Sequence, residues 1–239
     1  MQKTDIKNMT ILKEYINEDG LVDYNRLKKG EWLKNQIKRI EAFKLDAISS
    51  EEQFAFWLNA YNLLVLKGVY HEVKKNPSWD GNKSLWSRIK FFYLRKFNVA
   101  GKKLNLYNIE NKILRREFKD PRIHFAINCA SRSCPVLPRR LFETETLESH
   151  LEDLTRIFIN DENHVKYNEE TNILYVNQIF KWYSKDFLEH GGVKEFILRY
   201  LDRPIDHEKF SDAKIIYFDY DWSLNSQHTS QMLFIPSVQ

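Results

Sequence analysis

The sequence of 239 residues predicts an α+β protein, a single and mostly helical domain with a small sheet. Long segments carry apolar residues at helical spacing, while only three short segments alternate as strands do. Glycine and proline together number 13, and 43% of the residues are hydrophobic, which excludes collagen-like and disordered chains. No internal repeat and no convincing linker divides the chain.

The N-terminal part of the chain is predicted to be helical. Residues 1–45 are polar and helical in pattern, with a turn at Glu18-Asp19-Gly20. The clearest helix covers residues 51–70, and Ser49 with the acids after it supplies a capping start. This helix is apolar nearly all round, which predicts that it is buried in the core. Gly68 is expected to mark its end.

The second half of the chain is predicted to mix helices with short strands. Residues 76–103 are aromatic and irregular, and a helix at 104–118 is broken by Asp120-Pro121. Alternation predicts a strand at 123–128 that places His124, Ala126 and Asn128 on one face. After a proline-containing loop we expect an amphipathic helix at 142–160, a strand at 172–176, helices at 179–187 and 193–201, and a strand at 214–219.

The sequence also predicts the domain limits and the cellular location of the protein. We expect a helical extension at 1–17, the main domain at 18–227 and a frayed tail at 228–239. The formal charge of +4 is too mild to imply nucleic acid, and no apolar stretch is long enough for a membrane span. The first residues lack the apolar region of a signal peptide, so we expect a cytoplasmic protein, or an exported one if a leader has been removed. The oligomeric state is left open.

His124, Asn128 and the loop from Cys129 to Cys134 form one candidate site. A thiol beside an imidazole can form a thiolate–imidazolium pair, and an asparagine can hold the imidazole in place. On this interpretation Cys134 is a nucleophile, His124 a general base and Asn128 an orienting group. Alternatively, His124 is a core histidine beside small buried thiols. The two cysteines form a disulfide in an oxidising compartment and stay as thiols in a reducing one.

Polar residues on two predicted helices form further candidates. Asn59 and Asn62 are three residues apart and therefore share one face of the buried helix, with Tyr61 between them. A buried carboxamide without partners costs about 1–3 kcal/mol, so both must reach a ligand or brace a neighbouring loop. Tyr183 and Asp186 have the same spacing. They present a phenol and a carboxylate to a cleft, or they are a core aromatic and a surface acid.

Several other kinds of site do not fit the sequence. Cys134 and Arg140 have the C-x5-R spacing of a phosphatase loop, but Pro135 and Pro138 remove backbone N–H groups that such a loop needs. The two cysteines and one histidine lack a second pair at zinc-finger spacing, so no metal is expected. There is no glycine-rich nucleotide loop and no G-x-S-x-G elbow, and no cofactor is expected.

Five segments resemble, in the same order, the blocks of a known family. They are Asp19–Tyr24, Phe56–Asn62 (FWLNAYN), His124–Pro135 (HFAINCASRSCP), Ile179–Phe187 and Tyr220–Asn225. Over roughly residues 18–225 the chain thus resembles the domain of unknown function 547 (DUF547) family. One departure is Asn111 after Glu110, where the family is associated with histidine. The resemblance implies a family of bacteria and plants and supplies no established activity.

What the resemblance adds is position, because the polar residues named above fall inside the family's blocks. We expect them to gather in one place. One hypothesis is a thiol-dependent hydrolase or acyl-transferase acting on amide or ester bonds, with a papain-like helix-plus-sheet core as a fold-level analogy. The other is a non-catalytic binding module with an aromatic polar cleft for a peptide, sugar or other small molecule. The candidate ligand-binding residues are Asn59, Tyr61, Asn62, Arg132, Ser133, Tyr183 and Asp186.

Overall fold

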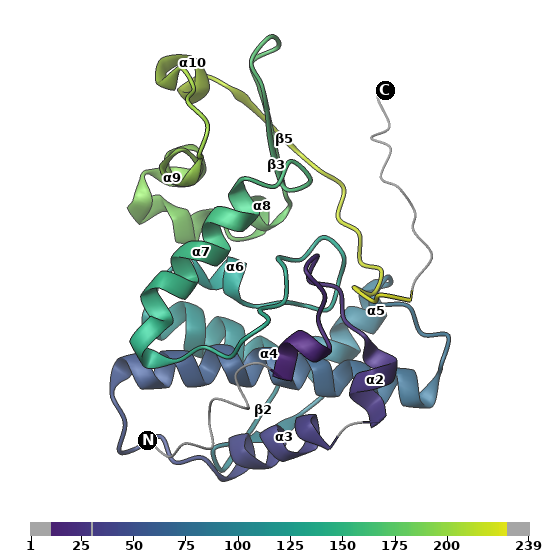
Figure 1. The fold of residues 1–239 in the computed structure, drawn as a ribbon. Coiled ribbons are helices and arrows are strands. Elements are labelled where there is room, and N and C mark those ends of the chain that lie inside the picture. Colours follow the sequence, from purple (N-terminus) through teal and green to yellow (C-terminus); the bar gives the residue numbers. More distant parts are fainter. Residues whose placement is uncertain (1–10, 30, 229–239) are drawn as a thin grey trace.

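A computed structural model describes residues 11–29 and 31–228 (Figure 1). The helices before residue 120 are η1 (Ile11–Glu14), α2 (Tyr24–Lys29), α3 (Trp32–Ala42), α4 (Ser50–Lys75), α5 (Leu85–Arg88), η2 (Ile89–Leu94) and η3 (Asn108–Phe118). The later helices are α6 (Ile123–Ala126), η4 (Thr144–Thr146), α7 (Leu147–Ile159), α8 (Ile179–Trp182), η5 (Ser184–His190), α9 (Gly192–Tyr200) and α10 (His207–Ser211). The strands are β1 (Phe97–Val99), β2 (Lys102–Leu104), β3 (Val165–Asn168), β4 (Ile173–Val176) and β5 (Lys214–Tyr217). Helices prevail and the two sheets are small, which confirms the α+β class.

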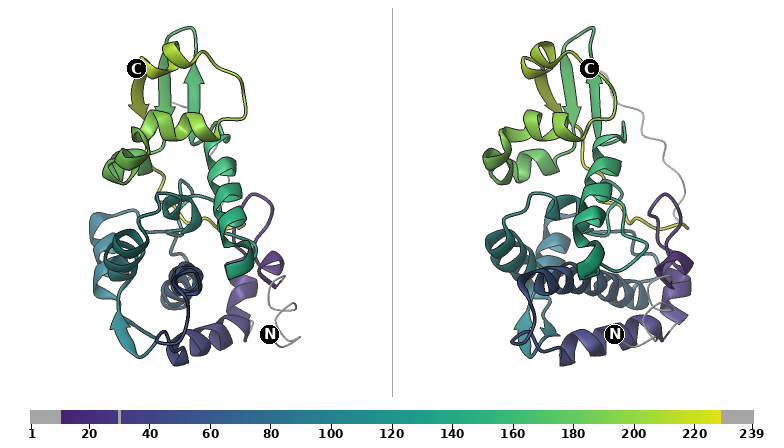
Figure 2. Two further views of the ribbon diagram at one scale, coloured as in Figure 1. Left: turned by 90° about the vertical axis from the view of Figure 1, so that its left-hand side faces the viewer. Right: turned by 60° about the vertical axis from the view of Figure 1, so that its left-hand side comes forward.

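Helix α4 runs through the middle of the helical part of the fold, where Figure 2 shows it end-on with other elements around it. Most of its residues between Phe54 and Val69 are buried, which explains why apolar side chains occur on all its sides. The predicted capping start is confirmed. The Ser49 hydroxyl accepts a hydrogen bond from the Glu52 N–H, and the Glu52 carboxylate accepts one from the Ser49 N–H at 2.8 Å.

The prediction that Gly68 ends this helix is wrong, because α4 continues to Lys75. Gly68 serves packing instead. A Cβ atom at this position would lie 2.7 Å from Cζ of Phe91, so only glycine lets the phenyl ring approach the helix backbone. The carbonyl of Gly68 also accepts a hydrogen bond from the Arg95 guanidinium at 2.7 Å.

The smaller part of the fold is a three-stranded sheet with a phenylalanine-rich core. Strands β3 and β4 form an antiparallel hairpin, and β5 adds to β4 in parallel. Helix α9 packs beside this sheet in both views of Figure 2. Six buried phenylalanine rings belong to the core of this part: Phe125, Phe158, Phe180, Phe187, Phe196 and Phe210.

After β5 the chain returns to the helical part and joins three separate segments there. Ser226 pairs with Val22, Leu224 pairs with Ser131, and Ser223 pairs with Gly81 through isolated bridges. The close approach at Gly81 needs glycine, since a Cβ there would lie 2.3 Å from a backbone carbonyl oxygen. The C-terminal segment 218–228 thereby ties the N-terminal turn to the loop that carries both cysteines.

The strand predicted at 123–128 is wrong. Residues Ile123–Ala126 form the short helix α6, and the chain becomes extended only from Ile127. A short apolar run cannot be assigned by periodicity alone, and the aspartate and proline that precede this one are a helix-start signal. The Asp120 carboxylate accepts a hydrogen bond from the Arg122 N–H at 2.9 Å. His124 and Asn128 therefore do not share a strand face.

Two hairpins were not predicted. Strands β1 and β2 are joined by Ala100 and Gly101, both with positive φ, and alanine is not a usual residue in such a turn. Strand β3 was also missed, because its pattern is short. The predicted tail lies from residue 229 on outside the described residues, as do residues 1–10 of the predicted extension. No described helix has the length and apolar character that crossing a membrane requires.

Candidate functional site

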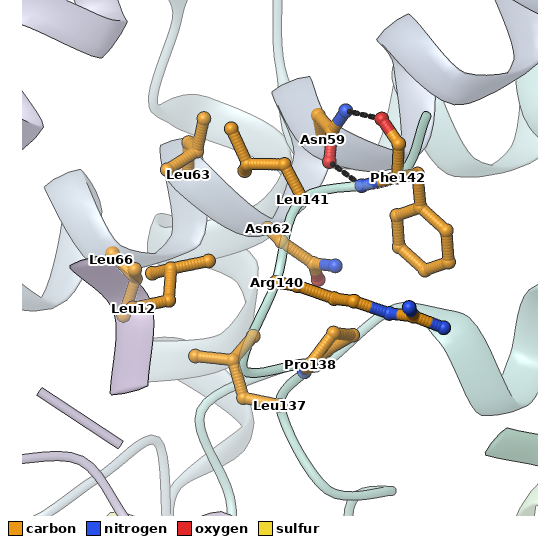
Figure 3. Close-up of a pocket in the computed structure, with 10 residues that line it drawn as sticks. All are labelled: Leu12, Asn59, Asn62, Leu63, Leu66, Leu137, Pro138, Arg140, Leu141 and Phe142. Atoms are coloured by element: carbon orange, nitrogen blue, oxygen red, sulfur yellow. Dashed lines mark hydrogen bonds between the residues drawn. The ribbon is translucent and has the colours of Figure 1, made fainter. Parts of the chain in front are cut away.

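Asn59 and Asn62 bind the backbone of distant loops. The Asn59 amide donates to the Phe142 carbonyl at 2.8 Å and accepts from the Phe142 N–H at 2.8 Å (Figure 3). The Asn62 amide donates to the Ala126 carbonyl at 2.9 Å and accepts from the Asn128 N–H at 2.9 Å. Each carboxamide thus replaces a backbone partner and braces a loop against α4, which was one of the two alternatives for these residues.

A small hollow lies beside these two amides. It is lined by apolar residues of α4 and by the segment 137–142, with the Arg140 side chain across it (Figure 3). Its volume is about 10 Å³, which is room for a single water molecule at most. A substrate does not fit there, so the asparagine pair of α4 does not line a ligand cavity in this structure.

Asn128 is the centre of a second backbone-bracing group. Its side chain is buried, donates to the Pro135 carbonyl at 2.6 Å and accepts from the Ala130 N–H at 2.6 Å. The Asn225 amide donates to the side-chain oxygen of Asn128 at 3.3 Å. All of these contacts fix the loop 128–135, and none reaches the imidazole of His124. Asn128 therefore does not orient His124 in this structure.

Cys129 and Cys134 form a disulfide across this loop, with their Cα atoms 6.2 Å apart. Of the two redox states that the sequence left open, the structure has the oxidised one. Two donors point at the Cys134 sulfur: the Cys129 N–H at 2.9 Å and the Tyr220 hydroxyl at 3.2 Å. The Ser131 hydroxyl donates to the Tyr220 oxygen at 3.0 Å. We call Cys129, Ser131, Cys134 and Tyr220 the sulfur cluster.

His124 lies in a different group of ionisable side chains. Its ring is buried, and its Nε2 lies 2.7 Å from the Asp186 carboxylate. The Arg115 guanidinium donates to both Asp186 oxygens, at 2.6 and 2.8 Å. The imidazole stacks on the Tyr183 ring with centroids 3.9 Å apart. Within the described residues, His124 forms no hydrogen bond with Cys134, so the predicted thiol–imidazole pair is not made here.

Glu110 extends this group into the core of the helical part. Its carboxylate is buried and accepts hydrogen bonds from Tyr61 at 3.0 Å and from Tyr183. Tyr183 thereby joins Glu110 to the stacked imidazole. We call Tyr61, Glu110, Arg115, His124, Tyr183 and Asp186 the carboxylate cluster.

Burial and charge set the protonation states of this cluster. Burial raises the pKa of Tyr61 and of Tyr183 well above the usual value, and the Glu110 carboxylate adds to this, so both phenols stay protonated. Burial alone would raise the pKa of Asp186, but hydrogen bonds from His124 and Arg115 hold it well below its usual range. The bond to Asp186 raises the pKa of Arg115. The cluster is thus a fixed ionic network around a histidine.

Three aromatic rings join the two clusters at the surface. Trp182 precedes Tyr183 in the chain and packs on Tyr220, with ring centroids 4.7 Å apart. Trp222 packs on both, and the Arg88 guanidinium lies 4.5 Å from its ring centroid. The Trp182 side chain is 46% exposed, so solvent reaches this group directly. We call Trp182, Tyr220 and Trp222 the aromatic triad.

The remaining predicted residues hold the C-terminal segment. The Ser133 hydroxyl accepts from the Asp221 N–H at 2.8 Å, and the Arg132 N–H donates to the Ser223 carbonyl at 2.9 Å. The Arg132 guanidinium reaches the Ser226 carbonyl at 3.4 Å. Of the residues predicted to gather in one place, His124, Tyr183 and Asp186 do so, and Cys134 lies in the adjoining sulfur cluster. The side chains of Asn59, Asn62 and Asn128 bind backbone groups instead.

Several residues of the site were not among the candidates from the sequence: Arg115, Ser131, Tyr220 and Trp222. Tyr220 and Trp222 lie in a segment that resembles a family block, so the presence of two aromatic residues in that block could have identified them as site residues. Arg115 gave no signal, because its partner Asp186 is 71 residues away. Asn111, at the position associated with histidine, bonds to the Tyr107 carbonyl at 3.2 Å and to Arg115.

No group of three or more His, Cys, Asp and Glu side chains in the described part of the chain is placed to hold a metal ion. The functional groups that the two clusters bring together are two sulfurs, buried phenols, one imidazole and two carboxylates.

Comparison with known proteins matches the middle of the chain to a family model. Residues 45–159 match the family model described as "Protein of unknown function, DUF547", and this segment of the chain belongs to that family. It contains α4, His124 and both cysteines. No curated protein and no solved structure matches the chain, so the papain-like analogy stays a prediction.

Proposed function

We propose that the protein is a thiol-dependent hydrolase or acyl-transferase for amide or ester bonds, with Cys134 as its nucleophile once the disulfide is reduced. The observation that carries the proposal is the pair of donors on the Cys134 sulfur, the Cys129 N–H and the Tyr220 hydroxyl. Hydrogen bonds to the charged form of an acid lower its pKa, so these donors favour a Cys134 thiolate at neutral pH.

The reaction begins with reduction of the disulfide. Two molecules of a low-molecular-weight thiol supply two electrons and two protons and become a disulfide themselves, and both cysteines become thiols. The Cys134 thiolate then forms a C–S bond with the substrate carbonyl carbon, and the carbonyl electron pair moves to oxygen. When this intermediate collapses, the C–N or C–O bond breaks and the leaving group takes a proton from the Tyr220 hydroxyl. Water or an acceptor nucleophile then forms a bond with the thioester carbon and gives its proton to the Tyr220 phenolate, and the C–S bond breaks to restore the Cys134 thiolate.

The carboxylate cluster has a positioning role in this proposal. His124 is bound to Asp186 through Nε2 and stacked on Tyr183, so its ring is held rigidly. Tyr183 in turn follows Trp182, which packs on Tyr220. The predicted role of His124 as a general base for Cys134 requires a movement from this arrangement, whereas a positioning role does not.

Thiol reactivity tests the proposal. In the variant Cys129→Ser, Cys134 is a single free thiol, and its rate of alkylation by iodoacetamide is measured against pH with the site located by mass spectrometry. We expect half-maximal rate well below pH 8.5, the usual pKa of cysteine. Adding Tyr220→Phe is expected to raise this midpoint, whereas Tyr217→Phe on β5 serves as the matched control. A midpoint near 8.5 that Tyr220→Phe leaves unchanged would refute the activated thiol.

A direct chemical test uses a p-nitrophenyl ester. The reduced protein is expected to gain one acyl group on Cys134, seen as a mass increase with release of p-nitrophenolate. The variant Cys134→Ser is the control and gains none. Acylation at lysines with Cys134 unmodified would contradict a nucleophilic role.

The aromatic triad favours a second candidate, a non-catalytic binding module for a peptide or sugar. Mutually packed aromatic rings with a polar edge are common in ligand sites, and Trp182 is partly exposed to solvent. Tryptophan fluorescence during titration with chito-oligosaccharides or aromatic peptides tests this. Trp182→Ala is expected to abolish the change, while Cys134→Ser retains it. Loss of binding in Cys134→Ser would instead favour the thiol enzyme.

A further inference from the structure

Large apolar side chains are exposed on the helical stretch 85–94, whose Arg88 also lies against Trp222 of the aromatic triad. Eight large hydrophobic side chains are exposed within the described residues, and four of them belong to this stretch of ten. They are Leu85 at 67%, Trp86 at 66%, Tyr93 at 47% and Leu94 at 58%. A soluble domain exposes single apolar residues everywhere, but such a concentration marks an interaction surface.

These four residues form two adjacent pairs on one side of a continuous helical segment. Helix α5 runs directly into the π-helix η2, so the stretch has no break between Leu85 and Leu94. Leu85 and Tyr93 are eight residues apart, as are Trp86 and Leu94, and eight residues span about two turns. The other side of η2 is anchored, because Phe91 is fully buried and packs against Gly68 of α4.

A groove with basic walls begins in the same segment. Its volume is about 620 Å³, and its walls come from α4, η2, the β1–β2 hairpin and Glu41 of α3. Six lysine and arginine side chains line it against two glutamates: Lys67, Lys75, Lys90, Arg95, Lys96 and Lys103. The formal charge of the whole chain is +4, so the excess in this groove accounts for all of it.

The positive charge of the groove is largely uncompensated. Both glutamates are already occupied, since Glu41 pairs with Lys67 at 3.3 Å and Glu72 pairs with Arg95. Within the described residues, no ion pair engages the remaining four cations, which are Lys75, Lys90, Lys96 and Lys103. The pKa of His71, which also lines the groove, is lowered. Burial lowers its pKa, and the charges of Arg95 and Lys67 lower it further.

We infer that this face binds the surface of an anionic lipid bilayer, with Leu85, Trp86, Tyr93 and Leu94 entering the headgroup boundary and the lysines of the groove holding lipid phosphates. Aromatic rings with a polar edge favour that boundary, and lysines beside them are drawn to anionic lipids. The two exposed leucines argue against nucleic acid, because a nucleic-acid surface combines basic charge with aromatic rings and has no need of exposed aliphatic side chains. Binding is peripheral.

Sedimentation with lipid vesicles tests the inference with the full chain. We expect binding to vesicles with 30% phosphatidylglycerol and at least tenfold weaker binding to pure phosphatidylcholine. Raising the salt concentration from 0.1 to 0.5 M is expected to weaken binding to the anionic vesicles, because exposed charges are screened. Emission of Trp86 is expected to shift to the blue on binding, and the variant Trp86→Phe removes that part of the shift.

Two pairs of variants separate the apolar from the ionic contribution. Leu94→Ser combined with Trp86→Ser, and Lys90→Glu combined with Lys103→Glu, are each expected to weaken binding at least tenfold. Leu188→Ser, at an equally exposed leucine in η5, and Lys209→Glu in α10 are the matched controls and are expected to bind as the parent does. All of these positions are exposed, so the melting temperature checks that every variant is folded.

Each other outcome overturns the inference. Absence of vesicle binding removes it outright. Equal binding to anionic and to phosphatidylcholine vesicles refutes the role of the lysines. If the control variants lose as much vesicle binding as the test variants, the named face is not the membrane contact. Binding of inorganic phosphate or inositol hexaphosphate without any vesicle binding assigns the groove to a soluble phosphate ligand and not to a membrane.

Discussion

The amide of Asn62 makes a quantitative prediction about stability. It satisfies the Ala126 carbonyl and the Asn128 N–H, both at 2.9 Å, in a place where its side chain is 7% exposed. In Asn62→Ala, both backbone groups lose their partner without access to bulk water. A buried polar group left unpaired costs about 1–3 kcal/mol, so we expect the free energy of unfolding to fall by about 2–5 kcal/mol.

Urea denaturation followed by circular dichroism measures this loss. For a chain of this size about 1 kcal/mol corresponds to a melting-temperature change of roughly 2–4 °C, so thermal melts are expected to show a fall of roughly 4–20 °C. The matched control is Lys74→Ala, at an exposed position of the same helix, which is expected to change the free energy by less than about 0.5 kcal/mol.

A second substitution at this position separates the two hydrogen bonds. Asn62→Asp keeps the acceptor for the Asn128 N–H but turns a carboxylate toward the Ala126 carbonyl. At pH 7 it is expected to be at least as destabilising as Asn62→Ala, and protonation at acid pH returns a donor and recovers part of the loss relative to the parent. If Asn62→Ala matched Lys74→Ala in stability, the bracing role would be refuted.

Three further predictions concern the rest of the fold. Gly68→Ala places a methyl group 2.7 Å from the buried Phe91 ring and is expected to destabilise by about 1–3 kcal/mol, measured by urea denaturation. Burial lowers the pKa of His150 and of His164 from about 6.5 to about 4, so the unfolded chain binds protons first. The free energy of unfolding is thus complete above pH 6.5 and falls toward pH 4, by at most about 3 kcal/mol per histidine; pH-independent stability in this range would contradict it. Ser49→Ala removes the cap of α4 and is expected to cost about 1 kcal/mol, whereas Ser49→Asp retains most of it in thermal melts.

The sequence predicts the elements whose signals are local. The capped start of α4 and its burial on all sides follow from Ser49, Glu52 and the apolar run after them. Strands β4 and β5 were placed within a few residues, because their short alternating segments are flanked by polar residues. The family resemblance was also carried by local blocks, and the match over residues 45–159 confirms it.

The sequence could not predict features that depend on distant contacts. The sequence predicts a strand where the structure has helix α6, because so short an apolar-rich run fits both periods. His124 was paired with its neighbours along the chain, whereas its partner Asp186 is 62 residues away. The role of Asn59 and Asn62 depended on which side of α4 the loops 126–128 and 142 approach, and no local pattern contains that information.

The return of the chain after β5 has a consequence for the order in which the protein is assembled. The cysteine loop gains its Ser131–Leu224 bridge and its Tyr220 contact only from residues near position 222. During synthesis on a ribosome, α4 and η3 are available to fold long before those residues leave the exit tunnel. Before Tyr220 has left the tunnel, its hydroxyl cannot contact the two sulfurs. Oxidants and thiol reagents therefore reach the sulfurs most easily during this interval.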